Sequence, residues 1–346
     1  MNPAMTIFVT EDAEKEPLYL QRYFRCLEWF HACARPYVQV VVLCQTESPD
    51  YAQHLLDTSG WDGFVVQLAH PRPGGYPLWD VCAEAAAAWP QVKGEYITFN
   101  HSEFMHYPGR LWSAIQCLRA KKPTIALGNL RRYNAPEKHV GAQREFSKAH
   151  SALVASAIDG GDPLLAADWM NGMVTRCWIY WGPEPEPGPS DYREDVFFAR
   201  KDWCDAMHFW DHADRMVFQD VYDLIRAAIE EASKWGLTPD CIRMTRAEHE
   251  AHHLWHSRLW KCWQPAVKEW FFSQGAAWTD TRFRSTENWN RCLAEAEAGW
   301  TGSNRAVQDM RRGPASTVAR FRSNIGDWFQ SGGADAVRQY IEARRR

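Results

Sequence analysis

Short apolar runs alternate with helical patterns over residues 1–135, and this alternation leaves few folds open to the chain. The run Val38–Cys44 (VQVVVLC) is rich in β-branched valine, which is typical of a strand buried on both faces. Further strands are predicted at residues 6–10, 63–68, 95–99 and 124–130, and helices at residues 18–34, 51–58, 78–89 and 108–120. The pattern predicts an α/β fold with a mostly parallel mixed sheet flanked by helices.

Polar or glycine-rich segments follow four of the predicted strands. They comprise residues 10–11, 45–47, 70–76 and 100–103. In open α/β sheets, ligands bind beyond the carboxyl ends of the strands. The sequence therefore predicts one site built from four separate segments.

The pattern changes after residue 135. Strands are predicted at residues 173–180 and 195–199, and a helix runs to about residue 235. Residues 182–190 (GPEPEPGPS) are too rich in proline for a helix or a central strand and predict a loop. From residue 246 onward we expect a mainly helical, Trp-rich region.

Composition leaves two interpretations of the C-terminal part open. Many of the 19 tryptophans lie between Trp169 and Trp300, which fits either stacking surfaces for sugars or bases, or a helical core. The net charge of −4 argues against a general polyanion binder, but residues 301–346 hold nine arginines against four acidic residues. Such a tail can attract phosphates or form a solvated helix face.

Cysteine usage and hydropathy indicate in which cellular compartment the protein resides. The ten cysteines form no CxxC pair, which argues against a zinc ribbon or a redox motif. No basic-then-apolar leader opens the chain, and no apolar run approaches the roughly 18 residues of a membrane span. We expect a soluble cytoplasmic protein with no membrane partner.

Three segments resemble the GT-A fold glycosyltransferases, in particular the family-two type. Residues 94–104 (GEYITFNHSEF) are similar to the strand that ends in the family's metal-binding Asp-X-Asp motif. Residues 195–201 (DVFFARK) resemble the strand entering the acceptor half, and residues 218–224 (FQDVYDL) resemble the catalytic Glu-Asp motif that opens a helix. The resemblance covers roughly residues 5–235.

The resemblance implies transfer of a sugar from a nucleotide-sugar donor, with Mn²⁺ or Mg²⁺ neutralising the diphosphate leaving group. It places Glu103 at the metal-binding carboxylate and His101 as a further ligand where the family has an Asp. Such a His-X-Glu site either suits a softer metal such as Mn²⁺ or binds no metal. It places Asp220 at the general base, with Asp223 as the alternate. A structural interpretation stays open for both sets: a cap after the strand, and acidic residues in the first turn of a helix.

Contacts to the nucleotide are the least specific part of the resemblance. The resemblance implies such contacts at Thr10, Glu11, Glu47, Arg72, Tyr76, Asp80, His101, Ser102 and Arg200. The alternative that these residues only belong to surface loops or helix caps stays open. On this basis residues 1–135 form the donor half, residues 136–240 the acceptor half, and residues 241–346 a helical extension.

Residues 249–253 (HEAHH) match the zinc-protease pattern HExxH, which predicts His249 and His253 on one helix face. The charged Glu248 before them and the lack of a distal third ligand argue against a protease. Two interpretations remain: His253 or His256 adds a ligand to the donor site, as in some GT-A enzymes, or the histidines are structural. We assign His256 as the ligand.

The acceptor is predicted from composition alone. Aromatic residues interleave with cations at Trp255, Arg258, Trp260, Lys261, Trp263, Lys268, Trp270, Arg282 and Arg284. This mixture suits nucleic acid, so the first hypothesis is a hydroxymethylated base in single- or double-stranded DNA, extruded for transfer. A saccharide or glycoconjugate acceptor is the alternative, and a non-catalytic binding module is a third.

Overall fold

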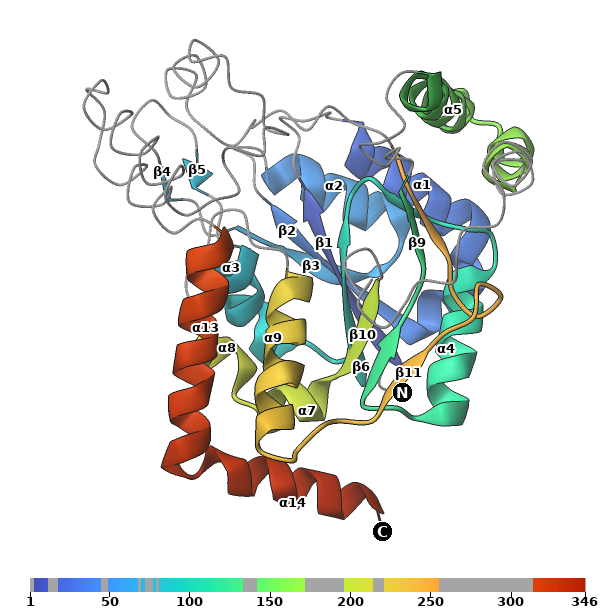
Figure 1. Cartoon of the computed structure of the whole chain (residues 1–346). Coiled ribbons are helices and arrows are strands. Elements are labelled where there is room, and N and C mark those ends of the chain that lie inside the picture. Colours follow the sequence, from blue (N-terminus) through green and yellow to red (C-terminus); the bar gives the residue numbers. More distant parts are fainter. Residues whose placement is uncertain are drawn as a thin grey trace.

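A seven-stranded sheet forms the centre of the protein in the computed structural model (Figure 1). The structure describes residues 3–11, 18–44, 49–67, 70–71, 77–78, 81–132, 142–171, 196–213, 221–254 and 314–345. The strand order is β11-β8-β10-β6-β1-β2-β3. The strands are β1 (Met5–Glu11), β2 (Val38–Cys44), β3 (Asp62–Val66), β6 (Tyr96–His101), β8 (Ile125–Leu127), β10 (Phe197–Arg200) and β11 (Cys241–Arg243).

All neighbouring strands pair in parallel, except that β10 runs antiparallel to both β6 and β8. The predicted mostly parallel, mixed sheet is therefore confirmed, and six of its strands lie close to their predicted places. β2 is buried along its whole length, as its β-branched sequence predicts, whereas β3 at the sheet edge is only partly buried.

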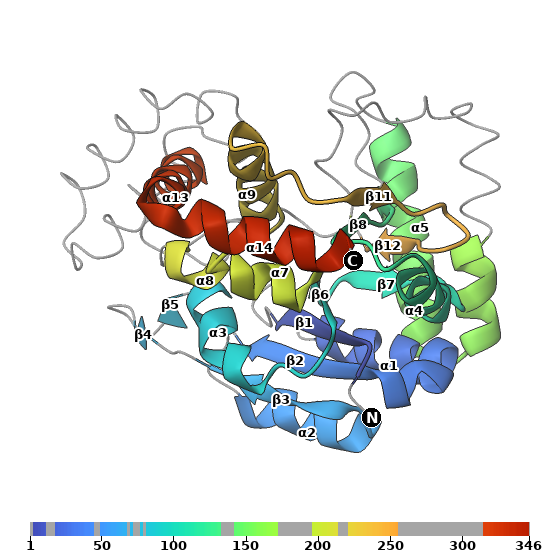
Figure 2. The same cartoon turned by 90° about the horizontal axis from the view of Figure 1, so that it is seen from below.

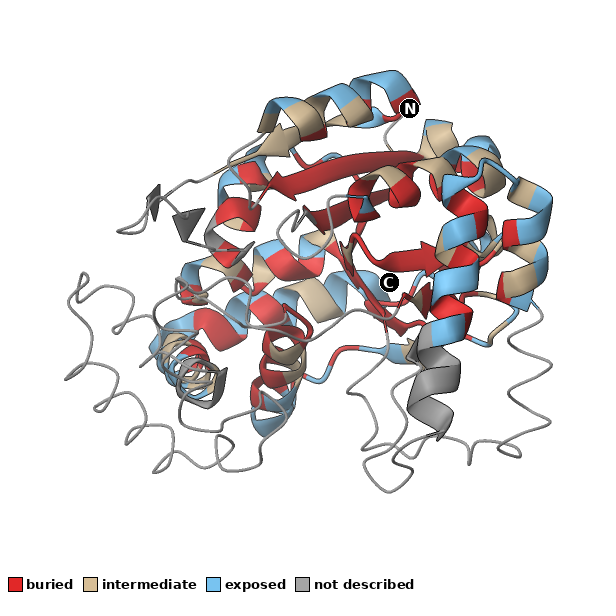
Figure 3. Ribbon diagram, turned by 90° about the horizontal axis from the view of Figure 1, so that it is seen from above, coloured by how far each residue is buried: buried red, intermediate tan, exposed pale blue. Residues whose placement is uncertain are grey.

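Side chains along β1 alternate between two hydrophobic clusters, because successive residues of a strand point to opposite faces. Ile7 and Val9 belong to the first cluster and Phe8 to the second. The first face is covered by α1 (Tyr19–His31), α2 (Pro49–Ser59), α4 (Arg110–Lys121) and α5 (Ala142–Asp159). The second is covered by α3 (Val81–Ala88), α7 (Lys201–Ala206), α8 (Phe209–His212), α9 (Val221–Lys234) and α13 (Pro314–Trp328). Figure 3 shows buried strands between helices that are exposed on their outer sides.

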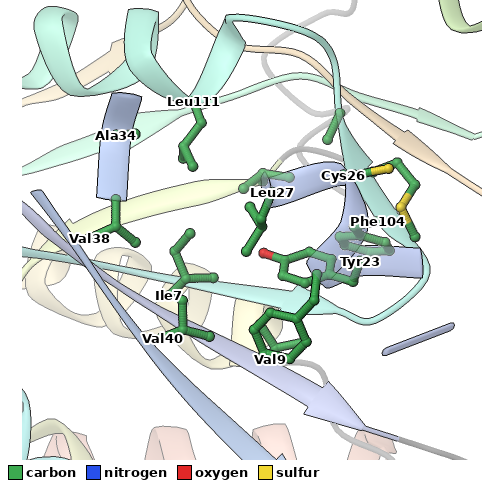
Figure 4. Packing of buried hydrophobic residues seen from close by; sticks show 14 of the residues in the cluster. Ile7, Val9, Tyr23, Cys26, Leu27, Ala34, Val38, Val40, Phe104 and Leu111 are labelled. Carbon is green, nitrogen blue, oxygen red and sulfur yellow. The ribbon is translucent and has the colours of Figure 1, made fainter. Parts of the chain in front are cut away.

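The helix α1 shows how the first cluster is built. Leu20, Tyr23, Phe24 and Leu27 recur at helical spacing and are all buried. In Figure 4, Tyr23 and Leu27 lie over the strand side chains, with Val9 beside Tyr23. Burying each such side chain contributes about 1.5–3 kcal/mol, so this stripe fixes the helix on the sheet.

A second, three-stranded sheet adjoins the first cluster. It has the order β7-β12-β9, with β7 (Phe104–His106), β12 (Ala251–His253) and β9 (Leu130–Arg132). β12 pairs antiparallel with β7 and parallel with β9. A segment from beyond residue 240 thus returns to the chain that directly follows β6.

The turn before β12 is held against α4. Lys121 Nζ lies 2.6 Å from Glu248 Oε1, and an Arg110 guanidinium nitrogen donates to the Ala247 carbonyl at 2.6 Å. The Glu248 carboxylate also accepts from the Thr245 backbone N–H at 2.7 Å, while the Glu248 N–H donates to the Thr245 hydroxyl. This reciprocal pair resembles a capping box and fixes the approach to β12.

Two helices form the C-terminal part of the described chain. α13 continues through a π-helical turn, Phe329–Gly333, into α14 (Ala334–Arg345), which runs in front of α7 in Figure 2. The Tyr340 hydroxyl donates to Asp202 at 3.1 Å, and Arg344 donates to the Lys122 carbonyl at 2.7 Å. Two further tail arginines form ion pairs, Arg322 with Glu230 and Arg338 with Asp335. Three of the tail arginines are therefore engaged by the protein itself.

Two expectations for the C-terminal part need correction. Residues 246–254 form a turn and a strand, because the segment completes a sheet, so the expected helical region does not begin at residue 246. The expected boundary at residue 240 does not mark the end of the sheets, since β11 and β12 lie beyond it. The helical C-terminal region is present at residues 314–345. The expected strand at residues 173–180, the loop at 182–190 and the Trp-rich residues 255–300 lie outside the described residues.

Among the described helices, none has the length and apolarity that a bilayer crossing requires.

Gly94 provides a test of the β1–β6 packing. A Cβ at this position would lie 2.2 Å from the Thr6 nitrogen and 2.4 Å from the Met5 carbonyl carbon, so Gly94→Ala requires backbone movement. We expect this variant to lose about 2 kcal/mol or more of unfolding free energy, measured by urea denaturation. Gly326→Ala in α13 is the control, because nothing lies within 4 Å of its added Cβ, and it should be neutral or stabilising by up to about 1 kcal/mol. Equal stability of the two variants would contradict the packing.

Candidate functional site

The candidate site lies where the strand order reverses. The chain runs from β1 to β2 and β3 on one side, and β6 pairs with β1 on the other side. At such a switch point the connections diverge and leave a crevice outside the carboxyl ends of the strands. Thr10 and His101 are register partners at these ends of β1 and β6. Two of the four predicted strand tips are thus neighbours.

Thr10 and His101 form a hydrogen bond across the switch point. Thr10 Oγ1 lies 2.9 Å from His101 Nδ1, and the Ser102 backbone N–H donates to the Thr10 carbonyl at 3.1 Å. Thr10 and Ser102 are buried, while His101 is half-buried. The bond to Thr10 engages Nδ1 and thereby orients the imidazole ring.

Glu103 and His253 form a second polar pair on the same rim. β12 pairs with β7 so that His253 lies opposite Phe104, and the Leu254 N–H donates to the Glu103 carbonyl at 3.0 Å. Glu103 Oε1 and His253 Nε2 are 3.7 Å apart, with side chains only 5% and 13% exposed. The Phe104 ring centroid lies 5.1 Å from those of both His101 and His253. The Phe104 ring therefore contacts both histidines.

The Glu103–His253 pair fits a divalent metal in type and spacing. Carboxylate oxygen and imidazole nitrogen suit Mn²⁺ and similar cations. With bonds of about 2.1 Å each, two ligands of one ion lie roughly 3–4 Å apart, which matches the observed separation of 3.7 Å. Within the described ranges, no group of three His, Cys, Asp or Glu side chains is placed to hold a metal. The pair fits an open site that a substrate completes, rather than a closed structural site.

The N-terminus of α9 lies at the same end of the sheet, where the parallel strands finish. Tyr222 packs on Phe197 with ring centroids 6.1 Å apart, and Phe197 packs on Phe99 at 6.0 Å. Phe197 pairs with Leu127 at the end of β8, so this aromatic row follows the carboxyl ends of the parallel strands. Asp223 stands in the first turn of α9, is 38% exposed on its side chain, and lies 3.9 Å from Arg226.

Arg200 was predicted at the donor site, but the structure places it at the opposite end of the sheet, where the parallel strands begin. β10 runs antiparallel, so its last residue pairs with Tyr96 at the start of β6. The guanidinium donates to Glu95 at 2.6 Å and to both carboxylate oxygens of Asp202 at 3.0 and 2.6 Å. Burial lowers the pKa of Arg200, but its interactions with Asp202 and Tyr96 outweigh burial and raise the pKa above its ordinary value. Arg200 is a structural cation beneath α14.

The expectation that His249 and His253 share one helix face is wrong, because residues 249–253 are not helical. His249 precedes β12 and His253 ends it. His249 Nε2 lies 3.4 Å from His106 Nδ1 in the interior, whereas His253 lies against Glu103 on the rim. The zinc-protease pattern therefore does not form here, and His253 supplies the second polar group of the rim.

Several predicted site residues are not tested by the structure. Glu47, Arg72, Tyr76, Asp80, Asp220 and His256 lie outside the described residues. Glu11 ends β1, and only its backbone is described.

A buried histidine network lies behind this rim, and no sequence pattern predicts it. Asn100 Nδ2 lies 2.9 Å from His106 Nε2 and donates to the Tyr23 hydroxyl at 3.0 Å. His31 Nε2 donates to the His106 carbonyl at 3.3 Å. Burial lowers the pKa of His31 to about 4 and that of His249 to about 3, and it holds the pKa of His106 well below its ordinary value. All three histidines are therefore neutral at pH 7.

No family model matches the chain, and no curated protein matches it. Among solved structures, it is similar to residues 1–349 of TarS from S. aureus, with 11% identity over 95% of this chain and 91% of that chain and a TM-score of 0.46. The complex of the same TarS fragment with UDP-GlcNAc gives a TM-score of 0.43 at 11% identity, covering 95% of this chain and 92% of that chain. Glucosyl-3-phosphoglycerate synthase from Mycobacterium tuberculosis, in complex with Mn²⁺, UDP and phosphoglyceric acid, gives 0.34 at 12% identity, covering 70% and 68%. All three TM-scores lie below 0.5, so these similarities carry no conclusion about this chain.

The buried histidines make stability depend on pH. The unfolded chain binds protons at an ordinary histidine pKa near 6.5, whereas the folded protein does not until about pH 4 at His31 and about pH 3 at His249. The unfolding free energy should therefore fall as the pH drops below about 6.5, by up to about 1.4 kcal/mol per pH unit for each histidine.

Urea denaturation between pH 7 and pH 5 measures this slope. His31→Gln keeps a donor for the His106 carbonyl but cannot titrate. The change of unfolding free energy per pH unit should therefore become smaller by up to about 1.4 kcal/mol, the contribution of one proton. His54→Gln on the exposed surface of α2 is the matched control and should leave the slope unchanged. An unchanged slope in His31→Gln would show that His31 does not stay neutral in the fold.

Proposed function

We propose that the protein is a glycosyltransferase that moves a sugar from a nucleotide-sugar donor to an acceptor hydroxyl. The observation that carries the proposal is the Glu103–His253 pair, 3.7 Å apart on the rim of the sheet, beside the Thr10–His101 bond at the switch point. The sequence resemblance of residues 94–104 to the donor-binding strand of GT-A enzymes supports it independently.

Charge neutralisation of the leaving group is the chemical task of this rim. A nucleoside diphosphate leaves with at least two negative charges, and a divalent metal supplies the Lewis acidity that stabilises them. Glu103 and His253 would hold such an ion, Mn²⁺ or Mg²⁺, leaving its other positions to diphosphate oxygens. His101, oriented by Thr10, lies close enough in the fold to contact the same donor. This assignment replaces His256 with His253 as the histidine ligand that the structure supports.

Activation of the acceptor is assigned to Asp220, with Asp223 as the alternate. An attacking hydroxyl transfers its proton to a carboxylate within hydrogen-bond reach. Support comes from the position of α9, whose first turn packs along the aromatic row that leads to Phe99 in β6. Asp220 immediately precedes this helix.

Donor binding provides the main test. UDP- and GDP-sugars are screened for an increase in Tm with and without Mn²⁺, since a ligand that binds only the folded protein stabilises it. We expect one nucleotide class to raise Tm, with a larger shift in Mn²⁺, and expect Glu103→Gln and His253→Asn to remove the Mn²⁺-dependent part. Asp57→Asn on the exposed surface of α2 is the control. No shift with any nucleotide sugar would contradict the proposal.

The same variants separate an enzyme from a binding module. Asp220→Asn should leave the donor-dependent increase in Tm intact while it lowers hydrolysis or transfer of the bound sugar at least about 100-fold. A protein that binds the donor but shows no turnover in any variant would be a non-catalytic module.

The remaining question is which molecule accepts the sugar. Arg322, Arg338 and Arg344 bond within the protein, so the tail gives less support to a DNA acceptor than its composition suggests. This favours a saccharide or glycoconjugate acceptor over a hydroxymethylated DNA base. We expect no binding to duplex DNA at about 50 mM salt in an electrophoretic mobility assay. Tight binding that falls steeply with salt would instead indicate phosphate contacts and restore the DNA acceptor.

A further inference from the structure

One buried imidazole joins the three elements that bring Glu103 and His253 together. His106 stands in β7, opposite Ala251, two positions along the ladder from the Phe104–His253 pair. Its Nε2 lies 2.9 Å from Asn100, the residue directly before His101. Its Nδ1 lies 3.4 Å from His249, four residues before His253. The site residues themselves are not members of this network.

The surroundings of the network leave it little freedom. His106 and His249 are 1% and 0% exposed. A Cβ on Gly128 would lie 2.4 Å from His249 Nδ1, and the Phe198 ring packs edge-on to His249 with centroids 5.0 Å apart. The Asn129 amide also donates to the His249 carbonyl at 3.0 Å. Because cores are closely packed, a change at His106 must be transmitted to these neighbours.

A neutral imidazole is suited to this place. It offers one acceptor and one donor, so its two ring nitrogens can bond to Asn100 and to His249 at the same time. An imidazolium carries no acceptor, so it could not form whichever of these two bonds requires one. An aliphatic side chain would form neither the hydrogen bond to Asn100 nor the one to His249.

We propose that His106 is a positioning residue, which holds the β6 tip and the segment entering β12 in the one arrangement in which Glu103 meets His253. Its meaning for sugar transfer rests on the proposed function, whereas the geometric relation does not. Loss of the imidazole should therefore uncouple Glu103 from His253 without removing either side chain.

A double-mutant cycle measures this coupling without metal or substrate. Glu103→Gln, His253→Asn and the double variant are made in the wild-type protein and in His106→Leu, and each is unfolded in urea. In the wild-type background we expect non-additive losses, because the two groups interact at 3.7 Å. In the His106→Leu background the losses should add. Equal coupling in both backgrounds, or none in the wild type, would overturn the proposal.

Controls separate positioning from general loosening of the core. Ile115→Ala removes a fully buried side chain of α4 from the same hydrophobic cluster and should leave the coupling intact. Loss of coupling in Ile115→Ala as well would contradict a specific role of His106. Should His106→Leu fail to fold, His106→Gln takes its place, because it keeps a polar group but not two nitrogens on opposite sides of a ring.

Metal binding provides the functional readout. With UDP present, His106→Leu should bind Mn²⁺ about tenfold more weakly than the wild type in a titration followed by calorimetry, while Ile115→Ala stays within about twofold. If the wild type binds no Mn²⁺ in the presence of UDP, the metal part of the proposed function fails, and the double-mutant cycle still decides the role of His106.

Discussion

The pairing of β12 with β7 is the contact on which the candidate site depends. β7 follows β6 after a two-residue turn, and β12 comes from far along the chain. Their antiparallel register sets His253 against the segment that carries Glu103, and the Leu254–Glu103 backbone bond extends the ladder. Without this pairing the rim would present one buried carboxylate with no basic partner from β12.

The two ends of the central sheet hold different sets of polar groups. At the carboxyl end, Thr10, His101 and Glu103 gather polar groups around the switch point. At the opposite end, Arg200 links Glu95 to Asp202, and Tyr340 of α14 joins the same carboxylate. The one antiparallel strand, β10, accounts for this separation, because it carries its terminal arginine away from the site.

The strands and helices of the first half follow from the pattern of apolar residues, and the valine-rich run of β2 is the plainest case. Thr10, His101, Ser102 and Glu103 could be assigned to a rim because ligands gather beyond parallel strands. Arg200 could not be placed, since residues 195–201 do not reveal strand direction. His253 was confused with a helical motif because β12 is three residues long, and its structure comes from pairing with β7 and β9. The histidine network draws on four separate elements and has no local pattern at all.

The position of a bound metal tests the central claim most directly. Crystals grown with UDP and Mn²⁺ can be measured at a wavelength where manganese scatters anomalously, which locates the ion independently of the surrounding density. The account predicts a single strong peak bonded to both Glu103 Oε1 and His253 Nε2, with diphosphate oxygens on its open side. A nucleotide bound with its diphosphate away from this pair, or a manganese peak held by other residues, would contradict it.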